Sequence, residues 1–119
     1  MQRNKGASFE RQIENMLIDA GFTAKRNYDQ AALGGFDIVI DRVPVAIECK
    51  RAARPLINQW WKQTVDQAGD LHPILIYKLD RREIRARVRM SLIDRNLSDD
   101  HIIELDTDGL VYLLREVAR

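Results

Sequence analysis

The chain has 119 residues, a length typical of one domain, so we expect a single domain over residues 1–119. Hydrophobic residues make up 45% of the chain and charged residues 31%, a composition that describes a soluble globular protein. No apolar run approaches the roughly 20 residues of a membrane span, so we expect no membrane partner. The one cysteine excludes an intramolecular disulfide and fits a cytoplasmic location.

The net charge of +1 hides an asymmetry along the chain. Residues 1–89 carry 16 Lys and Arg against 11 Asp and Glu, whereas residues 90–119 carry 3 against 7. A basic body with an acidic tail favours a polyanionic partner.

Apolar residues at helical spacing predict a first helix over Ser8–Ala20, with Ser8 as its N-cap and Gly21 as its terminating residue. The motif Lys5-Gly6-x-x-Phe9-Glu10-Arg11 opens this helix. Taken alone, Glu10 suits the positive start of a helix and Arg11 is solvated. The apolar face consists of Phe9, Ile13, Met16, Leu17 and Ala20.

A strand over Phe22–Tyr28 and a loop over Asp29–Gly35 follow. The loop ends in two glycines, which we interpret as a turn; close approach of a phosphate is the alternative.

Two short apolar runs, Ile38–Ile40 and Val43–Ile47, flank a polar turn and predict a hairpin. Strand side chains alternate, so Glu48 and Lys50 share one face and Asp37 lies within reach of Glu48 across the hairpin. Two carboxylates beside an ammonium suit metal-assisted hydrolysis, because a divalent cation removes the repulsion between the carboxylates. The alternative is an edge hairpin with a surface Glu–Lys pair.

Cys49 falls on the opposite, apolar face with Val45 and Ile47, so we interpret it as a core residue and not as a nucleophile. Arg51 and Arg54 follow the presumed site directly, where they could contact the backbone phosphates of a nucleic acid bound there.

A second helix is predicted over Leu56–Ala68, with Trp60 outside its core stripe. For Trp60 we favour packing or dimerisation over contact with DNA. The stripe consists of Ile57, Trp61, Val65 and Ala68, and another face carries Gln59, Gln63 and Gln67.

A turn over Gly69–His72 leads to a buried strand, Pro73–Lys78, and a second turn leads to an alternating strand over residues 84–90. Three arginines on one face of that strand repel each other unless an anion lies across them, and DNA phosphates match their spacing. A solvated outer face is the alternative. The basic residues of this region are Arg81, Arg82, Arg85, Arg87 and Arg89.

The tail predicts an edge strand over His101–Leu105 and a final helix, for which a β-hairpin is the alternative. The order of elements is helix, three strands, helix, two strands, strand and helix, which favours an α/β fold: a mixed sheet with helices on both sides.

Asp37, then ten residues, then Glu48-x-Lys50 resembles the motif of the PD-(D/E)XK nuclease superfamily, with Phe36 where that motif often has proline. Together with the opening motif, this order is similar to that of archaeal Holliday-junction resolvases and their phage-encoded relatives. The resemblance covers about residues 5 to 90 and implies the restriction-endonuclease-like fold, a central mixed β-sheet flanked by helices.

The resemblance also implies roles for single residues. Glu10 would complete a metal site, and Lys5 and Arg11 would contact DNA. A polar residue of the second helix would reach the site, for which Gln63 is the candidate. The serine that the family often carries in the loop before Asp37 is absent here.

We therefore expect an endodeoxyribonuclease, dependent on Mg²⁺ or on Mn²⁺ in its place, that resolves branched DNA such as Holliday junctions as a homodimer. Its ligands would be Glu10, Asp37, Glu48 and the carbonyl of Cys49, and Lys50 would position the attacking water. Its location would be the cytoplasm, or the host cytoplasm if a phage encodes it. The alternatives are a repair, nicking or restriction nuclease of the same superfamily acting on duplex DNA, and a non-catalytic DNA-binding module.

Overall fold

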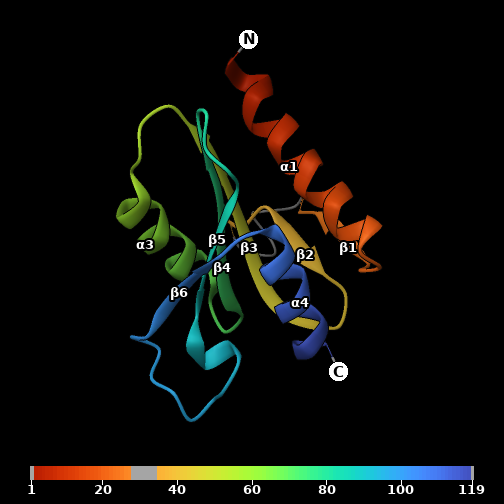
Figure 1. Ribbon diagram of the computed structural model, residues 1–119, viewed down its shortest axis with the longest axis vertical. Helices are drawn as coiled ribbons and strands as arrows, with labels where there is room; N and C mark the ends of the chain where they lie inside the picture. Colours follow the sequence, from red (N-terminus) through yellow and green to blue (C-terminus); the bar gives the residue numbers. More distant parts are fainter. Residues whose placement is uncertain (1, 28–34, 119) are drawn as a thin grey trace.

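The structure is a computed structural model that describes residues 2–27 and 35–118, with side chains from residue 6 onward. Its centre is one mixed sheet whose strands lie in chain order, from β1 to β6 (Figure 1). Strands β3 and β4 pair in parallel, and the other neighbours pair antiparallel. The strands are β1 (Ala24–Arg26), β2 (Ile38–Ile40), β3 (Val43–Ala52), β4 (His72–Leu79), β5 (Arg85–Arg89) and β6 (Ile102–Leu105).

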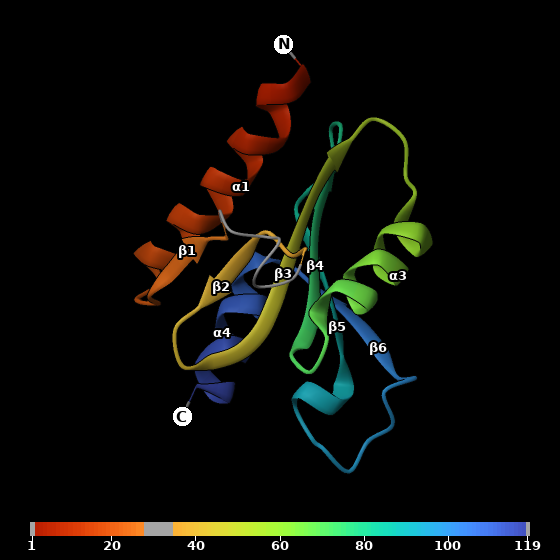
Figure 2. The ribbon, with the colours of Figure 1, turned by 180° about the vertical axis from the view of Figure 1, so that it is seen from behind.

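Helices cover both faces of this sheet (Figures 1 and 2). Helices α1 (Gln2–Asp19) and α4 (Thr107–Val117) lie on one face, and α3 (Ile57–Ala68) lies on the other. A short 3₁₀ helix, η1 (Met90–Leu92), follows β5. The predicted α/β class and the predicted order of elements are therefore confirmed.

The alternation predicted for β3 divides its side chains between two apolar layers. Val45, Ile47 and Cys49 belong to the large core beneath α1 and α4. Ala46, between them in sequence, packs with Phe36 and Ala68 on the side of α3. Glu48 and Lys50 follow Ala46 at alternate positions of β3, so they lie on the α3 side of the sheet for the same reason.

Helix α1 begins at Gln2, so the prediction that Ser8 caps it is wrong. Residues 2–5 have ordinary helix propensity, and a Cβ at Gly6 would meet no atom within 4 Å, so nothing ends the helix there. The predicted apolar face is confirmed, since Phe9, Ile13 and Leu17 are buried.

The end of α1 follows the prediction. Gly21 has φ of 100°, which a residue without Cβ adopts readily. Its N–H donates to the Ile18 carbonyl at 3.0 Å, and the Phe22 N–H donates to the Leu17 carbonyl at 3.0 Å, which is the Schellman pattern. The following strand is shorter than predicted, because the chain leaves this motif before it pairs at Ala24.

Helix α3 presents a different face to the sheet from the one predicted. Its buried residues are Trp60, Thr64 and Ala68, whereas Ile57, Trp61 and Val65 are half-buried. The indole of Trp60 lies 6.2 Å from the ring of Tyr77 on β4, so the sheet beneath selects the Trp60 face. Trp60 thus packs inside the molecule, and the prediction that it lies off the core stripe is wrong.

The remaining elements agree closely with the predictions. His72 begins β4 instead of ending the turn before it. The final helix is present, and the Asp106 side chain accepts the N–H of Gly109 at 2.7 Å as its N-cap. None of the helices in the described residues is long and apolar enough to cross a membrane.

Candidate active site

Asp37 and Glu48 meet on adjacent strands because of the register of β2 and β3. Ile38 pairs with Ile47, so the preceding and following residues, Asp37 and Glu48, stand across from each other. The Asp37 N–H donates to the Ile47 carbonyl at 2.8 Å, and the Cys49 N–H donates to Asp37 Oδ2 at 2.8 Å. Asp37 is 8% exposed and Glu48 is 5% exposed, so both carboxylates are largely removed from water.

Asn27 holds the backbone on the other side of Asp37. Its N–H donates to the Asp37 carbonyl at 2.7 Å, and its side-chain Nδ2 donates to the Phe36 carbonyl at 2.9 Å. Residues 28–34, which include residues 29–34 of the predicted loop and the missing serine position, lie outside the described residues. Asn27 therefore ties the two ends of that segment together beside the site.

Glu10 reaches the same place from α1. Its carboxyl group shares a hydrogen bond with Asp37 and accepts one from the Arg26 guanidinium at 3.1 Å. Arg26 lies on β1, and its backbone N–H donates to Glu14 at 3.1 Å, which holds the strand against the helix. The sequence pattern does not predict this role for Arg26, because nothing local indicates that β1 and α1 meet there.

Burial and mutual repulsion raise the pKa values of all three carboxyl groups. Desolvation, then the hydrogen bond and charge of Asp37, raise the pKa of Glu10 to about 7, while Arg26 acts to lower it. Desolvation and the charge of Glu48 raise the pKa of Asp37 to about 6, against the opposing hydrogen bond from the Cys49 N–H. Desolvation likewise raises the pKa of Glu48, opposed by Lys50.

Lys50 lies beside Glu48 on the same face of β3, as predicted. Its Nζ is 3.6 Å from Glu48 Oε1, and its side chain is 27% exposed. Because Glu48 is buried, the pair differs from the alternative of a surface Glu–Lys pair on an edge hairpin. An ammonium that is partly exposed and adjacent to a buried carboxylate can face a substrate from solvent.

The thiol of Cys49 faces away from these carboxylates into the core under α1 and α4. Burial and the nearby carboxylates raise the pKa of this thiol well above its ordinary value, so it is not a nucleophile. Its backbone contributes to the site through the N–H that binds Asp37.

The donor set fits a hard divalent cation, although a complete cage is not in place. Among the described residues, no group of three or more His, Cys, Asp or Glu side chains is arranged to hold a metal ion. The Glu10 carboxyl group accepts a hydrogen bond from Arg26 and shares one with Asp37. Asp37 and Glu48 remain as a close carboxylate pair, and Mg²⁺ typically takes one or two carboxylates and keeps several waters.

The residue of α3 that reaches the site is Gln67 and not Gln63. Gln67 Nε2 donates to Glu48 Oε2 at 2.6 Å and to the Gly35 carbonyl at 3.2 Å, with the amide orientation assigned from its neighbours. Gln63 stands one turn earlier and donates to the Gln67 side-chain oxygen at 3.2 Å. The same rotation of α3 about its axis that buries Trp60 directs Gln67 toward the sheet.

The predicted DNA-contacting residues divide into two groups. Arg11, on α1, and a set around the β3 and β4 ends are exposed, and contact with DNA stays a prediction for them. The side chain of Lys5 lies outside the described residues. The exposed set comprises Arg51, Arg54, Arg81, Arg82 and Arg85.

Arg87 and Arg89 belong to the second group, because the acidic tail supplies their anions. Arg87 Nε lies 2.9 Å from Glu104, which also accepts the hydroxyl of Tyr77, and Arg89 lies 3.7 Å from Asp99. The inference that three unpaired arginines require an external anion is therefore wrong for these two. Arg85 keeps its exposed place beside the turn that contains Arg81 and Arg82.

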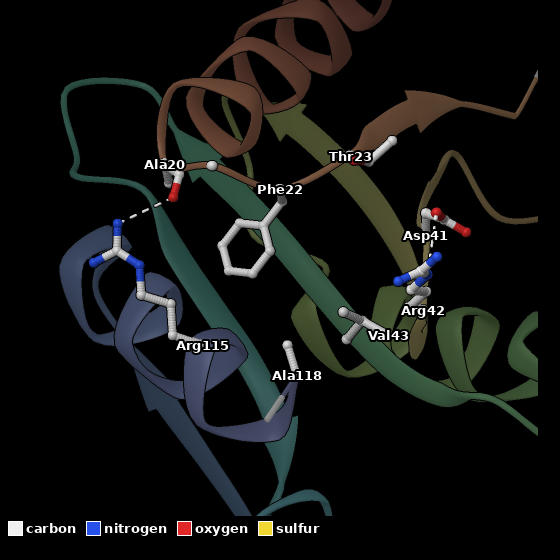
Figure 3. A pocket seen from close by; sticks show the side chains of 9 residues that line it. Ala20, Phe22, Thr23, Asp41, Arg42, Val43, Arg115 and Ala118 are labelled. Atoms are coloured by element: carbon white, nitrogen blue, oxygen red, sulfur yellow. Dashed lines mark hydrogen bonds and ion pairs between the residues drawn. The ribbon is translucent and has the colours of Figure 1, made fainter.

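A separate cavity of about 590 Å³ lies between the C-terminal ends of α1 and α4 and the β2–β3 turn (Figure 3). Arg115 reaches across it and donates to the Ala20 carbonyl at 3.0 Å, which fastens α4 to the end of α1. Arg42 in the turn faces Asp41 at 4.0 Å. The predicted site residues do not line this cavity, so it is not part of the candidate active site.

With this geometry established, comparisons define the class of protein. Residues 1–107 match the model of the family described as "phage putative PDDEXK endonuclease", and the chain belongs to that family. It is therefore a nuclease, with a restriction-endonuclease-like fold, and nucleases of this kind generally use divalent metal ions.

Among solved structures, the chain is similar to Hjc of Archaeoglobus fulgidus, a Holliday junction resolvase from an archaeal hyperthermophile. The TM-score is 0.54 and the sequence identity 26%, over 96% of this chain and 95% of that chain. A comparison with functionally curated proteins gave no match. The resemblance inferred from the sequence is thus confirmed at the level of family and fold.

Proposed function

We propose that the protein is a Mg²⁺-dependent endodeoxyribonuclease that cuts branched DNA at four-way junctions by hydrolysis. The observation that carries this proposal is the buried pair of Asp37 and Glu48, whose pKa values are raised first by desolvation and, for Asp37, also by the charge of Glu48. Lys50, beside the pair, supplies the third part of the motif. Two buried carboxylates destabilise the fold when they are unpaired, and a divalent cation bound between them removes that cost.

The chain's own groups have separate roles in this proposal. Asp37 and Glu48 would hold the cation with the carbonyl of Cys49, and Glu10 would join them by giving up its hydrogen bond to Asp37. Bound Mg²⁺ supplies positive charge that stabilises the phosphate oxygens and makes water a better nucleophile. Lys50 would orient the attacking water.

Hydrolysis then needs no covalent enzyme intermediate. The attacking water would lose a proton as its oxygen forms a bond to phosphorus, the opposite phosphorus–oxygen bond of the DNA backbone would break, and the departing oxygen would take up a proton, so that no net proton is gained or lost. The positive charge of the cation would offset the negative charges of Asp37 and Glu48 and also stabilise the negative charge on the phosphate.

The choice of branched DNA is supported by the similarity to an archaeal Holliday junction resolvase. A four-way junction is resolved by two symmetric cuts, and a two-fold homodimer places two equivalent sites on it. We therefore propose that the active form is a homodimer, with one carboxylate site in each subunit.

The test compares synthetic substrates of equal length on a gel: a four-way junction, a flap, a nicked duplex and a plain duplex. Each is incubated with Mg²⁺, with Mn²⁺ or with a chelator. We expect paired, symmetric cuts in the four-way junction that require the metal. Preferred cutting of the flap, nick or duplex would instead indicate a repair, nicking or restriction nuclease, and binding without cutting under every condition would indicate a DNA-binding module.

A further inference from the structure

One side chain of α3 enters the carboxylate site and has no part in the D-E-K motif. Gln67 Nε2 donates to Glu48 Oε2 at 2.6 Å, which is a short hydrogen bond to a buried carboxylate. The same nitrogen donates to the Gly35 carbonyl at 3.2 Å. Gln67 thus joins α3 to β3 and to the segment that leads into Asp37.

The place of Gln67 is possible because residue 35 is glycine. A Cβ at position 35 would lie 2.7 and 2.9 Å from atoms of the Gln67 amide, closer than carbon atoms approach without a shift. The nearest atoms to this Cβ belong to the far end of the Gln67 side chain, so a side chain at residue 35 and the Gln67 amide would compete for the same space. The missing side chain therefore serves the close approach of Gln67, a third reading beside the turn and the approach of a phosphate.

The amide of Gln67 is itself oriented. Its oxygen accepts the side-chain N–H of Gln63 at 3.2 Å, so its nitrogen is directed at Glu48. Lys50 faces the other oxygen of Glu48, at 3.6 Å. Gln67 and Lys50 thus contact different oxygens of Glu48, which also shares a hydrogen bond with Asp37. Gln67 is neutral, so it adds no charge to a site that must accept a cation.

We propose that Gln67 is a positioning residue that fixes the Glu48 carboxylate for the divalent cation and that the missing side chain of Gly35 leaves room for the Gln67 amide to do so. This inference rests on the proposed function. Outer hydrogen-bond partners of metal ligands typically contribute about 10- to 100-fold to metal affinity or activity. The contact reaches the site from α3, so it also couples the orientation of that helix to the chemistry.

The experiment is a double-mutant cycle between Gly35→Ala and Gln67→Ala, with Gln67→Met as a variant that keeps the length of the side chain. Three quantities are measured on the full chain: the melting temperature, the affinity for Mn²⁺ by calorimetry, and the single-turnover cleavage rate on the four-way junction. Gln59→Met, at an exposed position of α3, is the matched control.

We expect Gln67→Met to weaken Mn²⁺ binding and slow cleavage by about 10-fold or more, with unchanged affinity for junction DNA. Gly35→Ala should lower the melting temperature and the rate in the parent protein. In the Gln67→Ala background, Gly35→Ala should have little further effect, because the amide with which the added Cβ would clash is absent.

Additive effects of the two alanine changes, or Mn²⁺ affinity and rate unchanged in Gln67→Met, would overturn the assignment of Gln67 while leaving the nuclease proposal intact. A parent protein that neither binds Mn²⁺ nor cuts any substrate would overturn the proposed function and this inference with it. The melting temperatures in the cycle decide the Gly35–Gln67 contact in either case.

Discussion

The backbone N–H of Cys49 donates a hydrogen bond of 2.8 Å to the side chain of Asp37 across the β2–β3 pair. This bond holds the Asp37 carboxylate next to Glu48, although the two groups repel each other. It also opposes the rise in the pKa of Asp37, because it favours the charged form. The fold thus keeps two buried carboxylates together at a cost in stability, an arrangement typical of functional sites.

Removing either charge should stop catalysis without preventing binding of DNA. Asp37→Asn and Glu48→Gln keep the shapes of the side chains, and each should reduce the cleavage rate on the order of 10³-fold or more. Junction affinity, measured by gel shift in a chelator, should be unchanged or slightly higher. Asp41→Asn, in the exposed turn of the same hairpin, is the matched control and should cut normally. Full cleavage by either site variant would refute the catalytic assignment.

The stability of the metal-free protein should fall as the pH rises. The pKa of Asp37 is raised from 3.8 to about 6, and that of Glu10 from 4.5 to about 7, so the folded state holds protons that the unfolded state has lost. The free energy of unfolding should therefore decrease from about pH 4 to about pH 7 and level off above that. Thermal melts across this range in a chelator should show a decrease of roughly 5 °C.

The double variant Asp37→Asn/Glu48→Gln supplies the control for this pH dependence, which should shrink to the part that burial of Glu10 retains. Because metal ligands must be deprotonated, added Mg²⁺ should raise the melting temperature of the parent protein more at about pH 8 than at about pH 5. Stabilisation by Mg²⁺ that is equal at both values, or that persists in the double variant, would argue against these ligands.

Arg26 should set the pH at which the enzyme becomes active. Its guanidinium lowers the pKa of Glu10, so Arg26→Gln should raise that pKa above about 7. The midpoint of the pH–rate profile should then move to higher pH, with a lower rate at neutral pH. Lys25→Gln, at the exposed neighbouring position, should leave the profile in place. An unchanged midpoint in Arg26→Gln would remove Glu10 from the groups that control the reaction.

The arginines of β5 should differ in their contribution to DNA binding. Arg85 is exposed, whereas Arg87 is engaged by Glu104 at 2.9 Å. If Arg85 contacts a phosphate, Arg85→Gln should reduce the slope of log affinity against log salt by about 0.9, and Arg87→Gln should change it little. The triple change of Arg85, Arg87 and Arg89 to Gln should then resemble Arg85→Gln alone. Equal effects of Arg85 and Arg87 would show that DNA displaces Glu104.

The sequence by itself determined the β2–β3 hairpin and the side of it on which Glu48 and Lys50 lie. A strand repeats every two residues, so the position of each side chain follows from its neighbours once the strand is recognised. The apolar face of α1 and its end at Gly21 were predicted from local pattern for the same reason. Asp37 could be placed near Glu48 because a two-residue turn joins their strands.

Tertiary structure decided which residues from other elements reach that hairpin. The rotation of α3 about its axis depends on the sheet surface beneath it, so Trp60 became buried and Gln67, not Gln63, reached Glu48. The bonds of Arg26 to Glu10 and of Arg87 to Glu104 join residues 16 and 17 positions apart. Contacts of this kind follow from how elements pack in space, and no periodicity within one element encodes them.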